Sequence, residues 1–320
     1  TGVSSFEEAF EKLYSKHFDL IIIMVGIDRK VPMEIAGRLK SLYKYIPIYL
    51  LLNNNQYVGF FQGEKRRTGL IDNVFVWNGD SRIFFAMVKQ LEDYVNADND
   101  TKVGYSRIIL LVEDSPKYYS RYIPLLYHCV MEQTRRIIED VSTMDELYKV
   151  LRLRVRPKIL MASNYEEAQQ IFDKYKEFFL CLITDIKFEK NSKFDEKAGF
   201  ELVRYVKSEI PDLPTIIQSS DRTNEKLARE LNCVFIHKNS DTLAQDIRNF
   251  ISYNLGFGDF IYQDGTGRTI GTAKNMNEFE QQLQAIPTET LLYHASRNHF
   301  SLWLTARGEI QLAREIAPKK

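Results

Sequence analysis

Two adjacent carboxylates stand at the end of one apolar segment. Residues 109–115 read ILLVEDS, so four apolar residues lead directly into Glu113 and Asp114. Like charges this close repel each other unless a positive group lies between them. A solvated strand end is the ordinary interpretation of such a pair. The alternative is a site in which a cation balances both charges.

Three more polar side chains follow short apolar segments. LITD ends at Asp185, IIQSS contains Ser219, and FIHK ends at Lys238. Three carboxylates that meet would form a hard-oxygen site suited to Mg²⁺, which prefers carboxylates, water and phosphate oxygens. Asp185 could then attack a phosphoryl group as a nucleophile. Ser219 and Lys238 could bind the oxygens of that phosphoryl group.

The elements around these residues predict how they are positioned. Short apolar strands are expected at 107–114, 158–163, 180–186, 214–220 and 234–238, and each is followed by an amphipathic helix. Uninterrupted apolar strands that alternate with helices indicate a parallel sheet buried on both faces. Ligands of such doubly wound sheets bind beyond the carboxyl ends of the strands. All five polar side chains fall at those ends.

The first hundred residues repeat this pattern. FEEAFEKLYSKHFDLIIIM (6–24) mirrors YEEAQQIFDKYKEFFLCLITD (165–185), and the first copy begins at what would be its second helix. Met24 then stands opposite Asp185. Leu52 replaces the serine and Asn78 replaces the lysine, so the polar positions are lost while the apolar pattern is kept. This copy is expected to be a structural or pairing module.

The five polar positions, in this order on these strands, resemble the receiver domain of two-component response regulators. The resemblance covers residues 105–256. It implies that Asp185 is the phosphoacceptor, that Ser219 supplies the switch hydroxyl, and that Lys238 is the lysine of the receiver pattern. It also implies Mg²⁺ held by Glu113, Asp114 and Asp185, and a histidine kinase or a small phosphodonor as partner.

The second copy departs from the family pattern in several places. Asn239 follows Lys238 where the family usually has proline, so a cis peptide bond is not expected there. Lys187, two residues after Asp185, either offsets part of the phosphate charge or points to solvent. Residues 187–198 are expected to form a long loop. An insertion around 131–157 extends the first helix, and its basic end is expected to be a solvated face.

The tail breaks the alternating pattern. Residues 258–273 predict a hairpin that turns at 264–267, and a helix follows over 276–286 with one or two more behind it. The glycines of the hairpin also suit a phosphate-binding loop, but no GK[ST] motif appears. His294 and His299 have no metal-spaced partners in the sequence, so a packing or capping role is expected.

The order of the parts also resembles that of a narrower group of proteins. VEDSPKYYSRYIPLLY and YHASRNHFSLWLTARGE are similar to the amino-terminal regulatory part of bacterial phosphoenolpyruvate synthase or pyruvate phosphate dikinase-like proteins that carry receiver domains. That resemblance implies catalytic domains beyond Lys320 as partners. The role of this chain would then be regulatory.

We therefore expect an α/β fold with two receiver-like, doubly wound parallel five-stranded sheets, the first incomplete, and a small α+β tail. The expected domains are a degenerate receiver at 1–95, a linker at 96–104, a receiver at 105–256 and the tail at 257–320. Two function classes remain open. One is a phosphorylation-controlled switch for an attached or associated enzyme, and the other is a non-phosphorylated dimerisation scaffold.

The composition limits the classes of partner and the cellular location that are expected. Lys+Arg and Asp+Glu balance at 43 each, so the total charge gives no reason to expect nucleic acid or an acidic membrane. The three cysteines, Cys129, Cys181 and Cys233, lie in apolar segments and are expected to be reduced core residues. With no membrane-length apolar run and no secretory leader, a cytoplasmic location is expected.

The strand expected at 20–25 raises a separate problem. In this type of sheet the opening strand lies between the second and third strands, and the first copy lacks it. The apolar edge of 20–25 would then invite pairing with another chain. We expect an upstream segment, or a second copy in a dimer, to cover it.

Overall fold

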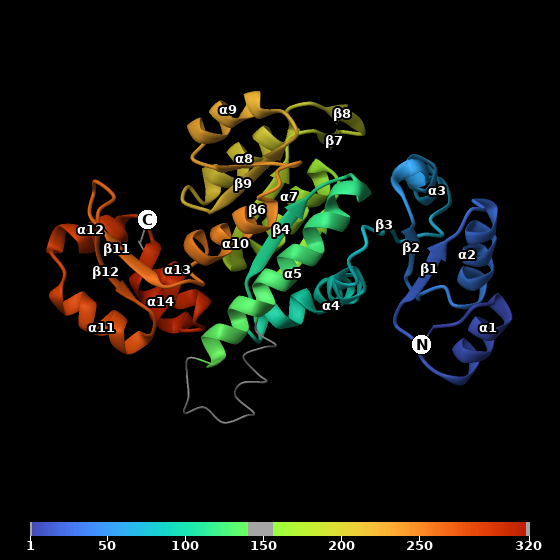
Figure 1. Ribbon diagram of the computed structural model, residues 1–320, viewed down its shortest axis with the longest axis horizontal. Helices are drawn as coiled ribbons and strands as arrows, with labels where there is room; N and C mark the ends of the chain where they lie inside the picture. Colours follow the sequence, from blue (N-terminus) through green and yellow to red (C-terminus); the bar gives the residue numbers. More distant parts are fainter. Residues whose placement is uncertain (1, 140–155, 318–320) are drawn as a thin grey trace. The chain divides into compact units, whose positions relative to one another are not determined.

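The computed structural model describes residues 2–139 and 156–317. Two compact units emerge from the contacts within the chain (Figure 1). The first contains the residues up to Val88 together with Ser115–Pro124. The second contains Lys89–Asp114 and the chain from Leu125 onward. Each unit is described by itself.

The first unit is built on a parallel sheet of three strands in the order β1-β2-β3. Its elements are α1 (Phe6–Ser15), β1 (Ile21–Val25), α2 (Lys30–Leu42), β2 (Ile48–Leu52), η1 (Asn55–Tyr57), α3 (Val58–Thr68), β3 (Asn73–Val76) and the start of α4 (Arg82–Lys102). Leu50 on the central strand and Phe61 on α3 lie in its core. Strands and helices alternate along the chain, as the sequence predicts.

The two edges of this sheet differ. Along β3, the first turns of α5 (Pro116–Glu139) supply hydrogen bonds to the strand backbone: Val76 N–H donates to Ser120 Oγ at 2.9 Å, and the Tyr119 hydroxyl donates to the Val74 carbonyl. Among the described residues, β1 has a strand partner only on its β2 side. Met24 on β1 is 61% exposed. The predicted open edge is therefore present.

The second unit contains a parallel sheet of five strands in the order β10-β9-β6-β4-β5. Its elements are β4 (Ile108–Val112), most of α5, β5 (Lys158–Ala162), α7 (Tyr165–Tyr175), η2 (Lys176–Phe178), β6 (Phe179–Asp185), β7 (Phe188–Lys190), β8 (Lys193–Asp195), α8 (Ala198–Glu209), β9 (Thr215–Ser219), η3 (Arg222–Asn224), α9 (Glu225–Glu230), β10 (Val234–His237), α10 (Leu243–Asn249) and η4 (Phe250–Asn254). The first of the five strands lies between the second and the third. This is the doubly wound order 2-1-3-4-5, so the expected α/β class is confirmed.

Both faces of this sheet are buried, as parallel sheets require. On one face α7 and α8 pack against β4 and β6 (Figure 1), and Phe172 of α7 and Val203 of α8 belong to the same core cluster. Residues that point to the other face, such as Ile109 and Cys181, are also buried. Cys129, Cys181 and Cys233 are all buried free thiols.

The two copies share a hydrogen-bond arrangement at one helix start. Ser5 caps α1 by accepting from Glu8 N–H, while the Glu8 carboxylate accepts from Ser4 N–H. Asn164 and Glu167 repeat this arrangement at the start of α7, with Ser163 N–H as the returning donor. A capping side chain followed three residues later by glutamate is a signal for a helix start. The arrangement agrees with the repeat but is not specific to it, because Asn275 and Glu278 form it again in the tail.

The strand register aligns the two copies residue by residue and corrects one position. Met24 pairs with Leu51 as Asp185 pairs with Gln218, so Met24 does stand at the position of Asp185. The lysine position differs from the prediction. Trp77 N–H donates to the Leu52 carbonyl as Lys238 N–H donates to the Ser219 carbonyl. Trp77, and not Asn78, is therefore the counterpart of Lys238.

Three other predictions are wrong. Residues 96–102 are not a linker, because α4 continues to Lys102 and buries Ala97 and Thr101. The expected loop at 187–198 contains an antiparallel hairpin, β7–β8. Of the insertion at 131–157, α5 reaches Glu139, and residues 140–155 lie outside the described residues. The described part of the basic end is not the expected solvated face, because Arg156 and Lys158 are buried and form ion pairs with Asp93 and Asp100. The domain bounds as such stay a prediction.

The tail forms the expected hairpin and helix, but within the described chain three helices follow that helix where one or two were predicted. Its elements are β11 (Phe260–Gln263), β12 (Thr269–Ala273), α11 (Met276–Ala285), α12 (Thr288–Ser296), α13 (His299–Ala306) and α14 (Ile310–Ile316). Phe260, Phe279 and Trp303 make up the centre of its aromatic core. No helix in the described ranges combines the length and the apolar character that crossing a membrane demands.

Candidate functional site

Four of the five predicted side chains meet at the carboxyl end of the five-stranded sheet. Glu113 and Asp114 follow β4, Asp185 ends β6, and Lys238 follows β10. Carboxylate oxygens of Glu113, Asp114 and Asp185 lie within 4.8 Å of one another. β4 and β6 are neighbours in the sheet, so the parallel pairing brings their ends together.

The side chain of Lys238 supplies the positive charge that the acid pair requires. Its Nζ lies 2.6 Å from Glu113 Oε2 and 2.7 Å from Asp185 Oδ2. Glu113 is fully buried and Lys238 nearly so. Because β9 lies between β10 and β6, the lysine side chain must extend across β9 to reach these oxygens. The acid pair is therefore not simply a solvated strand end.

Burial and the neighbouring opposite charges shift the pKa values of Glu113 and Lys238 in opposite directions. Burial raises the pKa of Glu113, and the charge of Asp185 raises it further, whereas Lys238 lowers it. Burial alone would lower the pKa of Lys238, but the two carboxylates outweigh it and the net pKa is raised. The lysine therefore keeps its proton and offsets part of the negative charge of the carboxylates.

The backbone around Asp185 is tightly packed. Asp185 Oδ1 accepts from the N–H of Ile186 at 2.7 Å, while Oδ2 faces Lys238. Gly199, near the start of α8, donates its N–H to the Ile186 carbonyl. A Cβ atom at Gly199 would lie 2.0 Å from the carbonyl oxygen of Asp185. Only a glycine lets this helix approach the strand end so closely.

The hydroxyl of Ser219 is directed into its own loop. Its Oγ accepts from Asp221 N–H at 3.0 Å and from Asn224 Nδ2 at 3.1 Å. It therefore holds η3 at the end of β9. The structure places Ser219 at the predicted strand end but engages its hydroxyl away from the carboxylates.

The donor set fits a magnesium ion. Three carboxylates supply hard oxygen ligands, the type that Mg²⁺ takes together with water and phosphate oxygens. Lys238 already contacts two of these three groups. A cation at Glu113 would therefore compete with the lysine ammonium group.

The departures from the family pattern can now be placed. Lys187 Nζ lies 3.4 Å from Glu196 Oε1 and is about half exposed, so it has a carboxylate partner on the hairpin side of the loop. No cis peptide bond occurs in the part of the chain that the structure describes, in keeping with Asn239 after Lys238.

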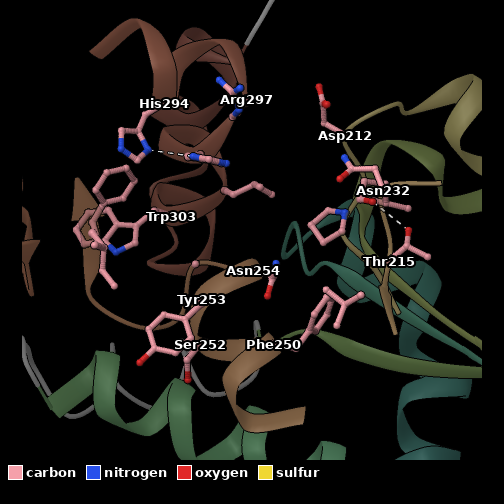
Figure 2. A pocket seen from close by; sticks show the side chains of 18 of the residues that line it. Asp212, Thr215, Asn232, Phe250, Ser252, Tyr253, Asn254, His294, Arg297 and Trp303 are labelled. Atoms are coloured by element: carbon pink, nitrogen blue, oxygen red, sulfur yellow. Dashed lines mark hydrogen bonds between the residues drawn. The ribbon is translucent and has the colours of Figure 1, made fainter. Parts of the chain in front are cut away.

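A second concavity lies away from these carboxylates. A pocket of about 790 Å³ is lined by residues at the amino-terminal ends of β9 and β10, such as Thr215 and Asn232, and by the tail residues Arg297 and His299 (Figure 2). Sequence reasoning did not find it, because its lining comes from distant segments without a shared motif.

The two tail histidines form part of that lining. His294 Nε2 accepts from Gln263 N–H at 2.8 Å, and its Nδ1 lies 3.0 Å from His299 Nδ1. His294 therefore carries its proton on Nδ1 and donates it to His299. Burial lowers the pKa of both rings, that of His294 to about 4. The expected packing role agrees with these contacts.

Comparisons with known proteins give one structural likeness. No protein-family profile matches the chain, and no curated protein matches it. The crystal structure of a response regulator receiver domain protein from Clostridium thermocellum is similar, with a TM-score of 0.28 and 19% identity over 45% of this chain and 94% of that chain. The fold class rests on the strand order and register described above.

Proposed function

We propose that the chain is a phosphorylation-dependent receiver switch with Asp185 as the phosphoacceptor. The observation that carries this proposal is the buried Lys238 ammonium group bound to both Glu113 and Asp185 at the mouth of a doubly wound sheet. A lysine in this position can leave one of the carboxylates and bind an oxygen of an incoming phosphoryl group, whose negative charge it then offsets.

The reaction would be a phosphoryl transfer from an acyl phosphate or a phosphohistidine donor. Asp185 Oδ attacks phosphorus, a new O–P bond forms, and the bond from phosphorus to the leaving group breaks. Lys238 binds an oxygen of the transferred group, and the Ser219 hydroxyl turns from its loop to bind another. Bound Mg²⁺, held by Glu113, Asp114 and Asp185, would supply further neutralising charge.

The partners in this proposal are a histidine kinase or small phosphodonor, and an enzyme that the switch regulates. The resemblance to phosphoenolpyruvate synthase-like proteins supports an enzyme of that type, attached or associated. Nothing in this role requires the chain to catalyse a reaction other than its own phosphorylation and dephosphorylation.

Acetyl phosphate labelling tests the proposal. With Mg²⁺ present, we expect intact-mass spectrometry to show the addition of one phosphate to the wild-type chain, and Asp185→Asn to abolish it while circular dichroism stays unchanged. Asp173→Asn is the matched control, because Asp173 is exposed on α7 and contacts Tyr205 instead. Equal labelling of wild type and Asp185→Asn would refute the assignment.

The second candidate function is a non-phosphorylated scaffold. One observation favours it: Lys238 is bound to both Glu113 and Asp185, so a cation at these oxygens would have to compete with the ammonium group. A folded wild-type chain that takes up no phosphate under any Mg²⁺ concentration would support the scaffold.

A further inference from the structure

The contacts of the unphosphorylated site do not explain why the side chain of Gln218 is buried there. Its side chain is fully buried on β9. Neither Oε1 nor Nε2 has a hydrogen-bond partner among the residues that the structure describes. Burying an amide without partners costs free energy, so buried amides in proteins are nearly always paired. An isolated one next to reactive groups requires an explanation.

The register places this amide beside the phosphoacceptor. Gln218 pairs with Asp185 on one side and with Ile236 on the other. Ile217 packs in the core with α7 and α8, and side chains alternate along a strand, so Gln218 points to the opposite face. By the same alternation, Asp185 shares that face, since Leu182 belongs to the core cluster and lies three residues away.

Lys238 must pass over this position. It starts beyond β10, and its Nζ reaches Asp185 on β6, so its side chain crosses the strand that carries Gln218. In the resting state the ammonium group is bound to two carboxylates on the far side of β9. The amide belongs to the strand that the lysine side chain crosses, and no hydrogen bond joins the two among the described residues.

We propose that Gln218 is a positioning residue for Lys238 in the phosphorylated state, an inference that rests on the proposed function. When Glu113 releases the ammonium group, the Gln218 carbonyl oxygen accepts a hydrogen bond from Nζ. The lysine is then held over the strand, with its other N–H groups directed at the phosphoryl oxygens. The amide is unpartnered at rest and partnered after phosphorylation, so it favours the second state.

This role has a consequence that simple packing lacks. Replacing Gln218 by leucine, of similar volume, removes an unpaired amide from the resting protein and should raise its melting temperature. The same change removes a contact of the phosphorylated state, so it should weaken that state. Gln133→Leu is the matched control, because Gln133 is also buried but its Nε2 donates to Ser252 Oγ. That change should lower the resting melting temperature and leave phosphoryl binding unaltered.

The test uses the whole chain with Mg²⁺ and beryllium fluoride, a mimic of the phosphoryl group. Melting temperatures are measured without the mimic and across a titration of it, for wild type, Gln218→Leu, Gln218→Met and Gln133→Leu. We expect both Gln218 variants to melt higher than wild type without the mimic and to bind it about tenfold more weakly. Acetyl phosphate labelling should slow by a similar factor.

The outcomes separate this inference from the proposed function. If wild type binds the mimic and the Gln218 variants bind it equally well, the positioning role is wrong and the receiver switch stands. If the Gln218 variants bind it weakly but also melt lower at rest, as Gln133→Leu does, the role is merely structural and the inference is wrong. If wild type neither binds the mimic nor takes up phosphate, both proposals fall together.

Discussion

Position 199 has no room for any side chain and therefore requires glycine. The helix that it begins approaches the strand end so closely that any side chain would meet the carbonyl of Asp185. The helix ends align Pro32 of the first copy with Gly199, because Tyr43 N–H donates to the Leu39 carbonyl as Ile210 N–H donates to the Val206 carbonyl. The sequence pairing of Gly37 with Gly199 is therefore wrong. Gly37 lies in the middle of α2, where a Cβ atom would meet only Leu70 Cδ1, at 3.7 Å.

Alanine substitution distinguishes the two glycines. We expect Gly199→Ala to destabilise the protein by about 1–3 kcal/mol, the usual cost of forcing extra volume into a packed region, and to reduce phosphate labelling by displacing Asp185. Gly37→Ala should stabilise by about 0.5–1 kcal/mol, because alanine is favoured over glycine in a helix. Urea unfolding measures both. Equal effects at the two positions would contradict the close-packing explanation.

Some of the site could be predicted residue by residue, and some could not. Glu113, Asp114, Asp185 and Lys238 were recognisable because polar residues that end apolar strands must gather at one edge of a parallel sheet. The isolation of Gln218 was not recognisable, because it depends on a side-chain direction and on how Lys238 crosses the sheet. Asn78 was predicted one residue away from Trp77, because a sequence offset cannot detect a change in loop length.

Asp93 on α4 ties several elements of the second unit together. Arg156 binds both of its carboxylate oxygens at 2.7 and 3.0 Å, the Tyr127 hydroxyl donates to it, and Ile159 N–H at the start of β5 donates at 2.9 Å. Asp93 and Arg156 are both buried. Removing one member of such a group leaves an uncompensated buried charge.

We expect Asp93→Ala to cost about 3–5 kcal/mol of unfolding free energy, the range found when one partner of a buried ion pair is removed. Asp98→Ala, on the same helix, should cost less than about 1 kcal/mol, because its ion pair with Lys174 is about half exposed. Urea denaturation of the two variants compares them directly. A similar loss in both would show that burial of the network does not determine its contribution.

The loop after β9 should report phosphorylation. Ser219 Oγ holds Asp221 N–H and the Asn224 side chain, and turning it toward a phosphoryl group would release both. We expect amide exchange over 221–231 to quicken with beryllium fluoride and Mg²⁺. Ser219→Ala should show fast exchange there from the start. If exchange over 215–245 does not respond in wild type, the scaffold is favoured.

The helices and strands were mostly predictable because their apolar periods are strong. The failures have physical causes. Residues 96–102, NADNDTK, are polar because most of that end of α4 faces solvent, and only Ala97 and Thr101 point inward. The β7–β8 hairpin is too short to show a period, and its two strands are held by pairing with each other and by a bridge from Asn164 to Glu189.

At the scale of the whole molecule, acid should weaken the tail. The pKa of His294 is lowered to about 4 in the folded chain, because the ring is buried beside His299. The unfolded chain takes up a proton near its ordinary pKa of about 6.5. The stability is therefore full above that value and falls by up to about 3 kcal/mol between pH 6.5 and 4.

Thermal melts across this pH range check the expectation. The His294→Gln variant should melt lower at neutral pH but lose much less stability on acidification. If its melting temperature falls with pH as steeply as that of wild type, another group is responsible.

The free edge of β1 leads to a prediction about assembly. An upstream segment or a second copy is expected to cover this edge. If a second copy pairs with β1, light scattering of the present chain will give a mass above the monomer. Met24→Lys should shift the chain toward the monomer, because lysine on an edge strand blocks pairing. Tyr14→Lys on α1 is the control at another exposed residue. A stable wild-type monomer that leaves β1 uncovered would contradict this.

The lysine that bridges Glu113 and Asp185 occupies oxygens that a divalent cation would also use. A bound Mg²⁺ would have to displace an ammonium group that is covalently attached to the chain, so we expect it to bind weakly. Lys238→Met should consequently bind Mg²⁺ more tightly than wild type while labelling poorly with acetyl phosphate. Calorimetric titration measures the Mg²⁺ affinity, and acetyl phosphate labelling measures the reactivity of Asp185. Weaker Mg²⁺ binding by Lys238→Met would argue against this expectation.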